Sequence, residues 1–342
     1  MKNILFICGS INQTTQMHQI SQHLANTNNY FTPYFADGVE DIAAKIGLLD
    51  FTVLGGRHRR DTLEYLYQNH LNVDHRGESR EYDLVVTCSD LIIQKNIQHK
   101  KTLLVQEGIT EPEGVIYALY KTLPILPRYL ANTATAGLSD SYDLFCVASN
   151  GYSQLFIRKG VKPEKIVVTG IPNFDNLEKH LNNSFGMKDY VLVATTPYRE
   201  SFRFEDRMSF LEQVKLQANG KPLIFKLHPS EEPERATFEI LSVLPDARVF
   251  THGNVNDMIA NASLVITQQS TCTFVALALG KETHTYLNKD ELNYLLPIQN
   301  GGISAKLIAQ QAQKLLEQVT TERLIGLGSQ KFWKFPEIAQ GR

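Results

Sequence analysis

The sequence lacks any run of 18 apolar residues, so we expect no membrane-spanning helix. None of its four cysteines, Cys8, Cys88, Cys146 and Cys272, forms a CxxC pair, which disfavours zinc and disulfides and favours free thiols in a reducing compartment. Neither charge sign dominates, and a net charge of −2 gives no reason to expect a nucleic-acid partner. The first residues, "MKNILFICGS", lack the longer apolar stretch and cleavage site of a secretory signal. These absences predict a cytoplasmic protein without a bound metal.

The sequence also lacks the GxGxxG pattern of nicotinamide and flavin sites, so we expect no cofactor of that kind. Gly9 and Ser10 follow the first apolar run instead. Glycine lets a backbone approach a ligand closely, and a following helix offers free amide groups, so both residues are candidates for contacting a ligand. A tight turn between strand and helix is the plainer interpretation of these two residues alone.

Short apolar runs alternate with helical patterns along the chain. Such runs are typical of parallel strands covered on both faces, and their alternation with helices predicts βαβ units. A polar, Asn-rich stretch at 170–189 separates two series of runs and predicts a domain junction. The expected fold class is α/β, with two Rossmann-like parallel-sheet domains facing each other across a cleft, at 1–170 and 171–322, and a C-terminal helix and tail at 323–342 that packs back toward the first domain. Strands are predicted at 3–8, 82–88, 101–106, 142–149, 165–170, 190–196, 222–229, 247–250, 263–268 and 282–287, and helices at 13–26, 204–217, 254–261 and 303–318.

Ligands of open α/β sheets bind at the carboxyl ends of the strands, and His228 stands at one such end. Pro229 favours an extended conformation at His228, which ends the strand. The imidazole can donate a hydrogen bond to a phosphate oxygen, and a neighbouring anion would keep it protonated. Lys226 in the same strand is a further phosphate-binding candidate. The alternative is a histidine satisfied by a backbone carbonyl.

Ser270 and Thr271 follow another strand of the second series, after Gln268 and Gln269. At the beginning of a helix their hydroxyls, the free amides and the helix dipole all favour an anion, so Gln269, Ser270 and Thr271 are candidates for binding nucleotide phosphate. Plain N-capping explains either hydroxyl alone. The hydroxyl pair and His228 lie in the same predicted domain and could share one diphosphate.

Two basic features complete the candidate set. Arg199, just after a strand, is a candidate fork for phosphate, with a solvated loop arginine as the alternative. The cluster "GGRHRRD" at 55–61, which contains Arg57, could bind an acidic or lipid-phosphate acceptor, although charge runs usually form solvated faces.

A carboxylate ends the strand "KTLLVQ", because Glu107 and Gly108 follow it directly. A residue at this place would face the cleft and could act as a general base. A carboxylate that caps the next turn is the alternative. Asp90, after the strand before it, is the reserve candidate, with Glu111 and Glu113 behind it.

The segments "GVKPEKIVVTGIPNFDNL", "KLHP" and "ITQQST…ALALGK" resemble GT-B-fold glycosyltransferases over roughly residues 140–285. The families that the chain resembles are the bacterial sialyl- and Kdo-transferases, the CDP-glycerol glycerophosphotransferases and the UDP-N-acetylglucosamine 2-epimerases. In the epimerases a His-Arg-Arg-Glu-Asn run follows the first strand of the second domain, but Pro197–Ser201 lacks the histidine. Their Gly-Thr-Arg-Pro-Glu is Gly9–Gln13 here, without the arginine, and their HVEAG is Leu104–Gly108.

The sialyltransferase pattern has an acidic pair before glycine, a His-Pro and a Ser-Ser/Thr. The chain has Gln106-Glu107-Gly108, His228-Pro229 and Ser270-Thr271, with Gln106 in place of the first acid. In the glycerophosphotransferases a Ser-Ser pair corresponds to Ser270-Thr271, but their flanking acids fall on Gln268 and Val275.

The resemblance implies that Glu107 is the base, and that His-Pro and Ser-Thr hold the nucleotide phosphate. It places Gly9, Ser10, Gly108 and Arg57 on the acceptor side. The implied function is metal-independent transfer of a sugar from a CMP-, CDP- or UDP-linked donor to a hydroxyl of a glycan or lipid-linked acceptor in surface polysaccharide synthesis, with peripheral membrane contact. A UDP-sugar 2-epimerase or hydrolase, and a non-catalytic sugar-nucleotide-binding protein, stay open as alternatives.

Overall fold

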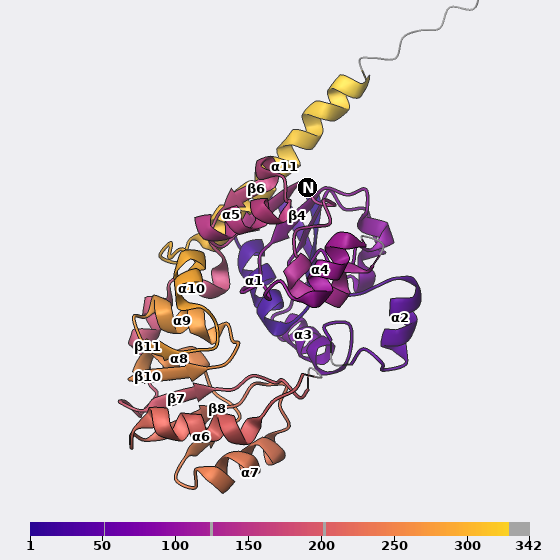
Figure 1. Cartoon of the computed structure of the whole chain (residues 1–342). Coiled ribbons are helices and arrows are strands. Elements are labelled where there is room, and N and C mark those ends of the chain that lie inside the picture. The colour runs from indigo at the N-terminus through magenta and orange to yellow at the C-terminus, as the bar shows by residue number, and fades with distance from the viewer. Residues whose placement is uncertain (51, 124–125, 201–202, 328–342) are drawn as a thin grey trace, which may run out of the picture.

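The computed structural model describes residues 1–50, 52–123, 126–200 and 203–327. Within this part of the chain lie two wholly parallel sheets, one of six strands in the order β2-β1-β3-β4-β5-β6 and one of five in the order β11-β10-β7-β8-β9 (Figure 1). This confirms the predicted α/β class with two parallel-sheet units. The strands are β1 (Lys2–Cys8), β2 (Thr27–Pro33), β3 (Leu84–Thr87), β4 (Thr102–Val105), β5 (Leu144–Val147), β6 (Ile166–Val168), β7 (Val191–Ala194), β8 (Leu223–Lys226), β9 (Arg248–Phe250), β10 (Leu264–Thr267) and β11 (Glu282–His284).

The apolar runs form the central strands, because both faces of each sheet are covered by helices. All residues of β3, β4, β7 and β10 are buried. Strand β2 was not predicted. Its sequence, TNNYFTP, is polar, and its first four residues are only half-buried at the edge of the sheet. It nevertheless pairs with β1 residue by residue, from Lys2–Thr27 to Cys8–Pro33.

The helices connect successive strands, and four of the predicted ones appear with shifted ends. The helix predicted at 13–26 is α1, which stops at Ser21. The α-helices are α1 (Ile11–Ser21), α2 (Gly38–Lys45), α3 (Gly56–Gln68), α4 (Val115–Thr122), α5 (Asn150–Lys159), α6 (Arg207–Ala218), α7 (Pro233–Val243), α8 (Val255–Asn261), α9 (Cys272–Ala278), α10 (Lys289–Leu295) and α11 (Ser304–Leu327). None of them, among the described residues, is long and apolar enough to cross a bilayer.

The segment between β6 and β7 contains only short 3-10 helices, at Pro172–Phe174 and Leu177–Leu181. Aromatic side chains pack the two sheet units together near this junction. The ring of Phe274 in α9 stands edge-on to Tyr152 of α5 and to Phe174, with centroids 6.1 Å apart in both cases. The two units therefore share a packed contact at the junction, and the boundaries at 170 and 322 stay predictions.

Helix α11 crosses back from the second unit and packs against α1 and β3 of the first (Figure 1). It runs without a break from Ser304 to Leu327, so no separate helix begins at residue 323. The predicted tail at 328–342 lies outside the described residues.

Candidate functional site

A cavity of about 680 Å³ lies between the carboxyl ends of the two sheets. Its walls include Asp90, Glu107, Gly108 and Glu111 from the first unit. Asn173 and Phe174 line it from the junction, and Asn254, Asn256, Thr271 and Cys272 line it from the second unit. The structure thus brings Glu107, Gly108 and Thr271 to one cavity, whereas His228 and Ser270 of the same motif set are not among its lining residues.

The carboxylate of Glu107 is held at the cavity wall by the beginning of α1. Ser10 Oγ donates to Glu107 Oε1 at 3.0 Å, and Gln13 Nε2 donates to Oε2 at 2.6 Å. Ser10 also caps α1 by accepting from the Gln13 amide at 3.3 Å. A Cβ on Gly9 would overlap the Gln13 side-chain amide, so glycine there leaves room for the group that orients Glu107. Gly9 and Ser10 therefore support the candidate base.

Gly108 lies close to the junction and to the second unit at the cavity wall. A Cβ on this residue would lie 3.4 Å from both Phe174 Cε2 and Thr271 Cγ2. The buried Gln106 fixes this turn, because its Nε2 donates to the Gly108 carbonyl at 2.8 Å and its Oε1 accepts from the Ala148 amide at 2.9 Å. The glutamine in place of the first motif acid is thus a framework residue.

Asp90 lines the cavity but its carboxylate is fully engaged elsewhere. Arg128 Nη1 lies 3.1 Å from Oδ2, and the amides of Gly137 and Ser139 donate to Oδ1 and Oδ2 at 2.9 and 3.0 Å. The side chain is almost completely buried. Its contacts tie the segment 128–139 to the end of β3, which suits a structural role.

His228 is fixed at the end of β8 with a defined orientation. Its Nδ1 accepts from the Ser230 amide at 3.1 Å, so the neutral ring carries its proton on Nε2. Burial, together with the nearby side chains of His58, Lys226 and Arg57, lowers the pKa of His228 to about 4. Without an anion the ring is therefore a neutral donor, and its protonation beside a bound phosphate stays a prediction.

The loop that carries His228 is anchored by a buried carboxylate. Glu231 Oε2 accepts from the His228 amide at 2.9 Å and from the Thr195 hydroxyl. Its other oxygen pairs with Arg207 Nη2 at 3.1 Å, in a site where both side chains are almost completely buried. Burial raises the pKa of Glu231, which the arginine opposes. Nothing in the sequence besides the acidic run after His-Pro pointed to this anchor.

The basic cluster at 55–61 meets the His-Pro loop. Arg57 Nη1, at the beginning of α3, donates to the carbonyl of Pro229. After burial, His58 and Arg57 are among the causes that lower the pKa of His228, so both side chains lie close to the imidazole. The Arg57 side chain thus lies at the His-Pro loop, and its assignment to the acceptor side stays a prediction. The sequence showed the cluster but not its partner 172 residues away.

The other predicted phosphate ligands have protein partners. Lys226 Nζ donates to the carbonyls of Leu227 and Thr251 at 2.8 and 3.1 Å, and burial lowers its pKa. Arg199 pairs with Glu239 at 2.6 Å. Ser270 Oγ accepts from the Cys272 amide at 3.2 Å, which is the N-capping alternative. Thr271 alone of the pair lines the cavity.

Solved structures with the same arrangement place this architecture among known folds. A UDP-GlcNAc 2-epimerase from Neisseria meningitidis, bound to UDP-GlcNAc, is 12% identical with a TM-score of 0.56 over 91% of this chain and 100% of that one. MnaA from S. aureus with UDP is 14% identical with a TM-score of 0.56, over 95% and 90% of the two chains. The wall teichoic acid polymerase TagF is 12% identical with a TM-score of 0.52, over 95% and 90%. The chain has the GT-B fold. No protein-family profile and no curated protein matches the sequence.

The two halves of this GT-B fold are joined across the cavity by a pair that sequence inspection missed. Arg203 Nη2, after β7, lies 2.6 Å from Glu111 Oε1, after β4, and Arg203 Nη1 donates to Gln269 Oε1 at 3.3 Å. Gln269 is thereby engaged on the protein. In the sequence, Arg203 could be noticed only as an arginine that follows a predicted strand. Arg199 follows the same strand and pairs with Glu239 instead, so this position alone does not identify the pair with Glu111.

The GT-B cavity has thiols on both of its walls. Cys88 and Cys272 line it, and all four cysteines are free. Burial raises the pKa of both thiols, and the nearby Glu107 raises that of Cys88 further, so neither is an activated nucleophile. Within the described part of the chain, no group of three or more His, Cys, Asp or Glu side chains is arranged to hold a metal ion.

Proposed function

We propose that the protein is a glycosyltransferase that moves a sugar from a CMP-, CDP- or UDP-linked donor to a hydroxyl of a glycan or lipid-linked acceptor in surface polysaccharide synthesis. The observation that carries the proposal is the carboxylate of Glu107 in the cavity wall, oriented by Ser10 and Gln13. Two fixed donors leave the remaining lone pairs of the carboxylate as the proton-accepting positions, which favours a positioned base over a solvated side chain.

In this proposal Glu107 takes the proton of the acceptor hydroxyl. The acceptor oxygen bonds to the anomeric carbon of the donor sugar, and the bond from that carbon to the nucleotide phosphate breaks. The electron pair of that bond leaves with the phosphate. No metal enters the proposed step, because donor groups of the second unit face the departing charge.

The departing phosphate would lie between Thr271 and His228. The Nε2 proton of His228 is available to a phosphate oxygen, because Nδ1 is already engaged by Ser230. Arg57 adds positive charge at the same corner. An anion bound there would favour the protonated imidazole and raise its pKa from about 4. Lys226, Arg199, Gln269 and Ser270 contribute mainly through the protein contacts described above.

A UDP-sugar 2-epimerase or hydrolase is the second candidate. Solved epimerases of the same fold hold UDP-GlcNAc, which favours a UDP-sugar as ligand for this fold. One observation speaks against epimerisation. Arg199, in the segment after β7, forms an ion pair with Glu239, which neutralises its charge. A non-catalytic sugar-nucleotide-binding protein is the third, and only turnover distinguishes it from the other two.

The decisive experiment incubates the protein with CMP-, CDP- and UDP-sugars, with and without glycan acceptors, and analyses the products by mass spectrometry. Acceptor-dependent release of nucleotide together with a heavier glycan supports the transferase. Formation of the 2-epimer, or equal nucleotide release without acceptor, supports the second candidate instead. Binding in a thermal-shift assay without any product supports the third.

The cellular setting belongs to the same proposal. Four free cysteines suit a reducing cytoplasm. Peripheral membrane contact would bring a lipid-linked acceptor to the first unit, where α2 and α4 carry exposed apolar side chains such as Val39, Ile42, Val115 and Leu119. Flotation with liposomes tests this contact, and a protein that stays at the bottom of the gradient argues for a free glycan acceptor.

A further inference from the structure

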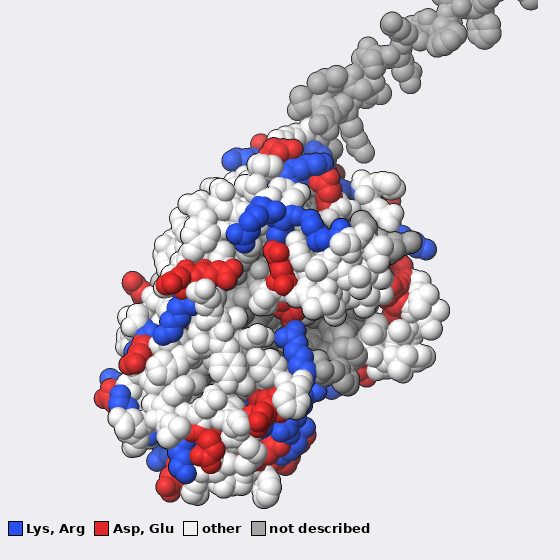
Figure 2. All heavy atoms as spheres, in the orientation of Figure 1, with Lys and Arg blue, Asp and Glu red and all other residues white. Residues whose placement is uncertain are grey.

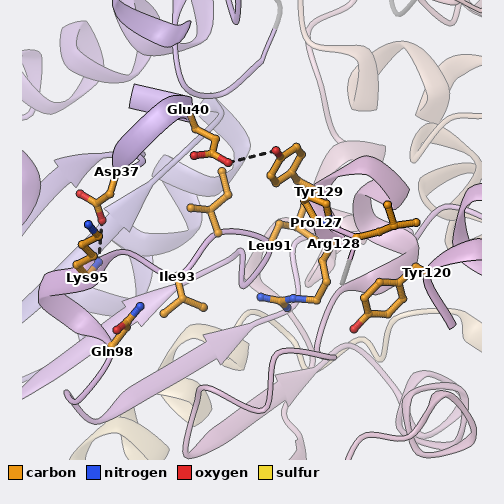
Figure 3. A pocket seen from close by; sticks show the side chains of 12 residues that line it. Asp37, Glu40, Leu91, Ile93, Lys95, Gln98, Tyr120, Pro127, Arg128 and Tyr129 are labelled. Carbon is orange, nitrogen blue, oxygen red and sulfur yellow. Dashed lines mark hydrogen bonds between the residues drawn. The ribbon is translucent and has the colours of Figure 1, made fainter. Parts of the chain in front are cut away.

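A second pocket, of about 380 Å³, opens in the first unit beside the reaction cavity. It lies between the beginning of α2 and the segment that follows α4, with the chain at 91–93 along one wall. Figure 3 shows the Tyr129 phenol turned toward Glu40, and Tyr120 on the far side of Arg128. None of the candidate catalytic or phosphate-binding residues lines this pocket.

The lining combines aromatic rings with polar groups that have no partner among the residues that the structure describes. Tyr120 is half-buried, and no described residue hydrogen-bonds to its hydroxyl. The side chains of Gln98 and Lys95 are likewise without a partner among the described residues. Tyr129 donates to Glu40 Oε1 at 3.2 Å, which fixes its ring at the rim and leaves Glu40 Oε2 open.

This set of groups matches a saccharide better than other small ligands. Aromatic rings pack against the apolar C–H faces of a sugar, while amide, carboxylate and hydroxyl groups pair with its hydroxyls. The charges at the pocket balance, with Asp37 and Glu40 against Lys95 and Arg128, so the lining selects neither a strong anion nor a strong cation. Acidic and basic side chains are also mixed over the face of the molecule in Figure 2.

The pocket is separated from the reaction cavity by a thin partition. Leu91 lines both. Asp90 lines the cavity while its ion-pair partner Arg128 lines the pocket, at 3.1 Å from Asp90 Oδ2. Arg128 therefore has one N–H engaged by Asp90 and further N–H groups for a ligand. Leu91 therefore marks the side on which an extended acceptor could continue from the cavity into the pocket.

We propose that this pocket is an acceptor subsite that binds a saccharide unit distant from the reacting hydroxyl, so that the acceptor is an oligosaccharide or polysaccharide end. That the bound saccharide belongs to an acceptor rests on the proposed function. The binding of a saccharide at Tyr120 and Gln98 does not depend on it. It predicts that a monosaccharide acceptor is used less efficiently than a longer one with the same end.

Saturation-transfer NMR on the full chain tests binding with a panel of linear di- to tetrasaccharides that contain glucose, galactose, N-acetylglucosamine or sialic acid. We expect at least one to bind, and Tyr120→Ala and Gln98→Ala to weaken it by roughly tenfold. Tyr67→Ala is the matched control, because Tyr67 is an exposed tyrosine of α3 that lines neither cavity and should leave binding unchanged.

Absence of binding by the whole panel, or equal weakening by Tyr67→Ala and Tyr120→Ala, overturns the inference. A thermal-shift measurement with UDP, CDP and CMP on the same variants separates the two proposals. Saccharide binding that depends on Tyr120 in a protein that transfers no sugar retains the subsite and rejects the transferase. Transfer that is indifferent to Tyr120 and to acceptor length rejects the subsite and retains the transferase.

Discussion

Arg203 Nη2 lies 2.6 Å from Glu111 Oε1, and this ion pair links the loop after β7 to the loop after β4 across the cavity. The two side chains belong to different sheet units, so the pair spans the cavity. Arg203 also donates to Gln269, which extends the link to the turn before α9. The coupling free energy between Arg203 and Glu111 can be measured without knowing the substrate.

Breaking the Arg203–Glu111 pair should cost little stability. Both side chains are partly exposed, at 43% and 33%, so water screens the attraction and the coupling should be about 0.2–1 kcal/mol. A double-mutant cycle with Arg203→Gln and Glu111→Gln, followed by denaturant unfolding, gives that coupling. A value above about 2 kcal/mol would contradict the screened pair described here.

Asp90 should behave as a structural residue. Its removal leaves Arg128 and two amides unpaired in a buried place, so Asp90→Ala should lower the free energy of unfolding by about 3–5 kcal/mol. Glu111→Ala is a control at the same cavity with an exposed partner. If Asp90→Ala instead folds with wild-type stability and loses turnover, the reserve assignment as a catalytic acid or base takes precedence.

The apolar runs predicted ten of the described strands because a parallel strand buried on both faces needs apolar residues throughout. The same rule could not predict strand β2, because an edge strand can be polar where it faces solvent. Glu107 and Thr271 were candidates because they follow predicted strands, and the carboxyl ends of parallel strands lie at one edge of a sheet. Both residues line the cavity. These predictions needed only local patterns.

The partners of these residues could not be predicted in the same way. Gln13 binds Glu107 across 94 positions, and a glutamine early in a helix carries no local signal of such a contact. Arg57 contacts Pro229 across 172 positions, and a basic cluster carries no local signal of that contact. The burial that lowers the pKa of His228 is likewise a property of the packed loop, which the sequence pattern does not show.

The stability of the protein should fall below neutral pH partly through His228. Its folded-state pKa of about 4 lies below the unfolded value of about 6.5, so between these two values the unfolded chain binds the extra proton. Stability is therefore fully present above pH 6.5 and declines as the pH falls toward 4. The slope from this one group is at most about 1.4 kcal/mol per pH unit.

His228→Asn removes that titration, so the difference in unfolding free energy between wild type and variant should shrink from pH 7 to pH 4.5. Denaturant unfolding at several pH values measures it. Saturating UDP or CDP should flatten the wild-type decline, because a phosphate beside His228 favours its charged form. Parallel curves for wild type and variant would mean that His228 titrates normally.

Glu107→Gln is expected to abolish most transfer while preserving the fold. The amide has nearly the same size, and its oxygen can still accept from Gln13 while its NH₂ group can donate to Ser10 Oγ, so the site should stay assembled. The variant cannot take the acceptor proton, and loss of general-base help lowers turnover by about 10²–10⁴. Nucleotide affinity, measured by calorimetry, should stay near wild type because His228 and Thr271 are untouched.

Gln13→Ala separates positioning from proton transfer. It keeps the carboxylate but removes the 2.6 Å hydrogen bond that orients it, so turnover should fall, but less than in Glu107→Gln. Gln22→Ala, in the residue that follows α1, is the control and should leave turnover unchanged. Near-wild-type transfer by Glu107→Gln would move the base to Glu111, whereas loss of nucleotide binding by Glu107→Gln would show that Glu107 maintains the contact of Gly108 with Thr271 and does no proton transfer.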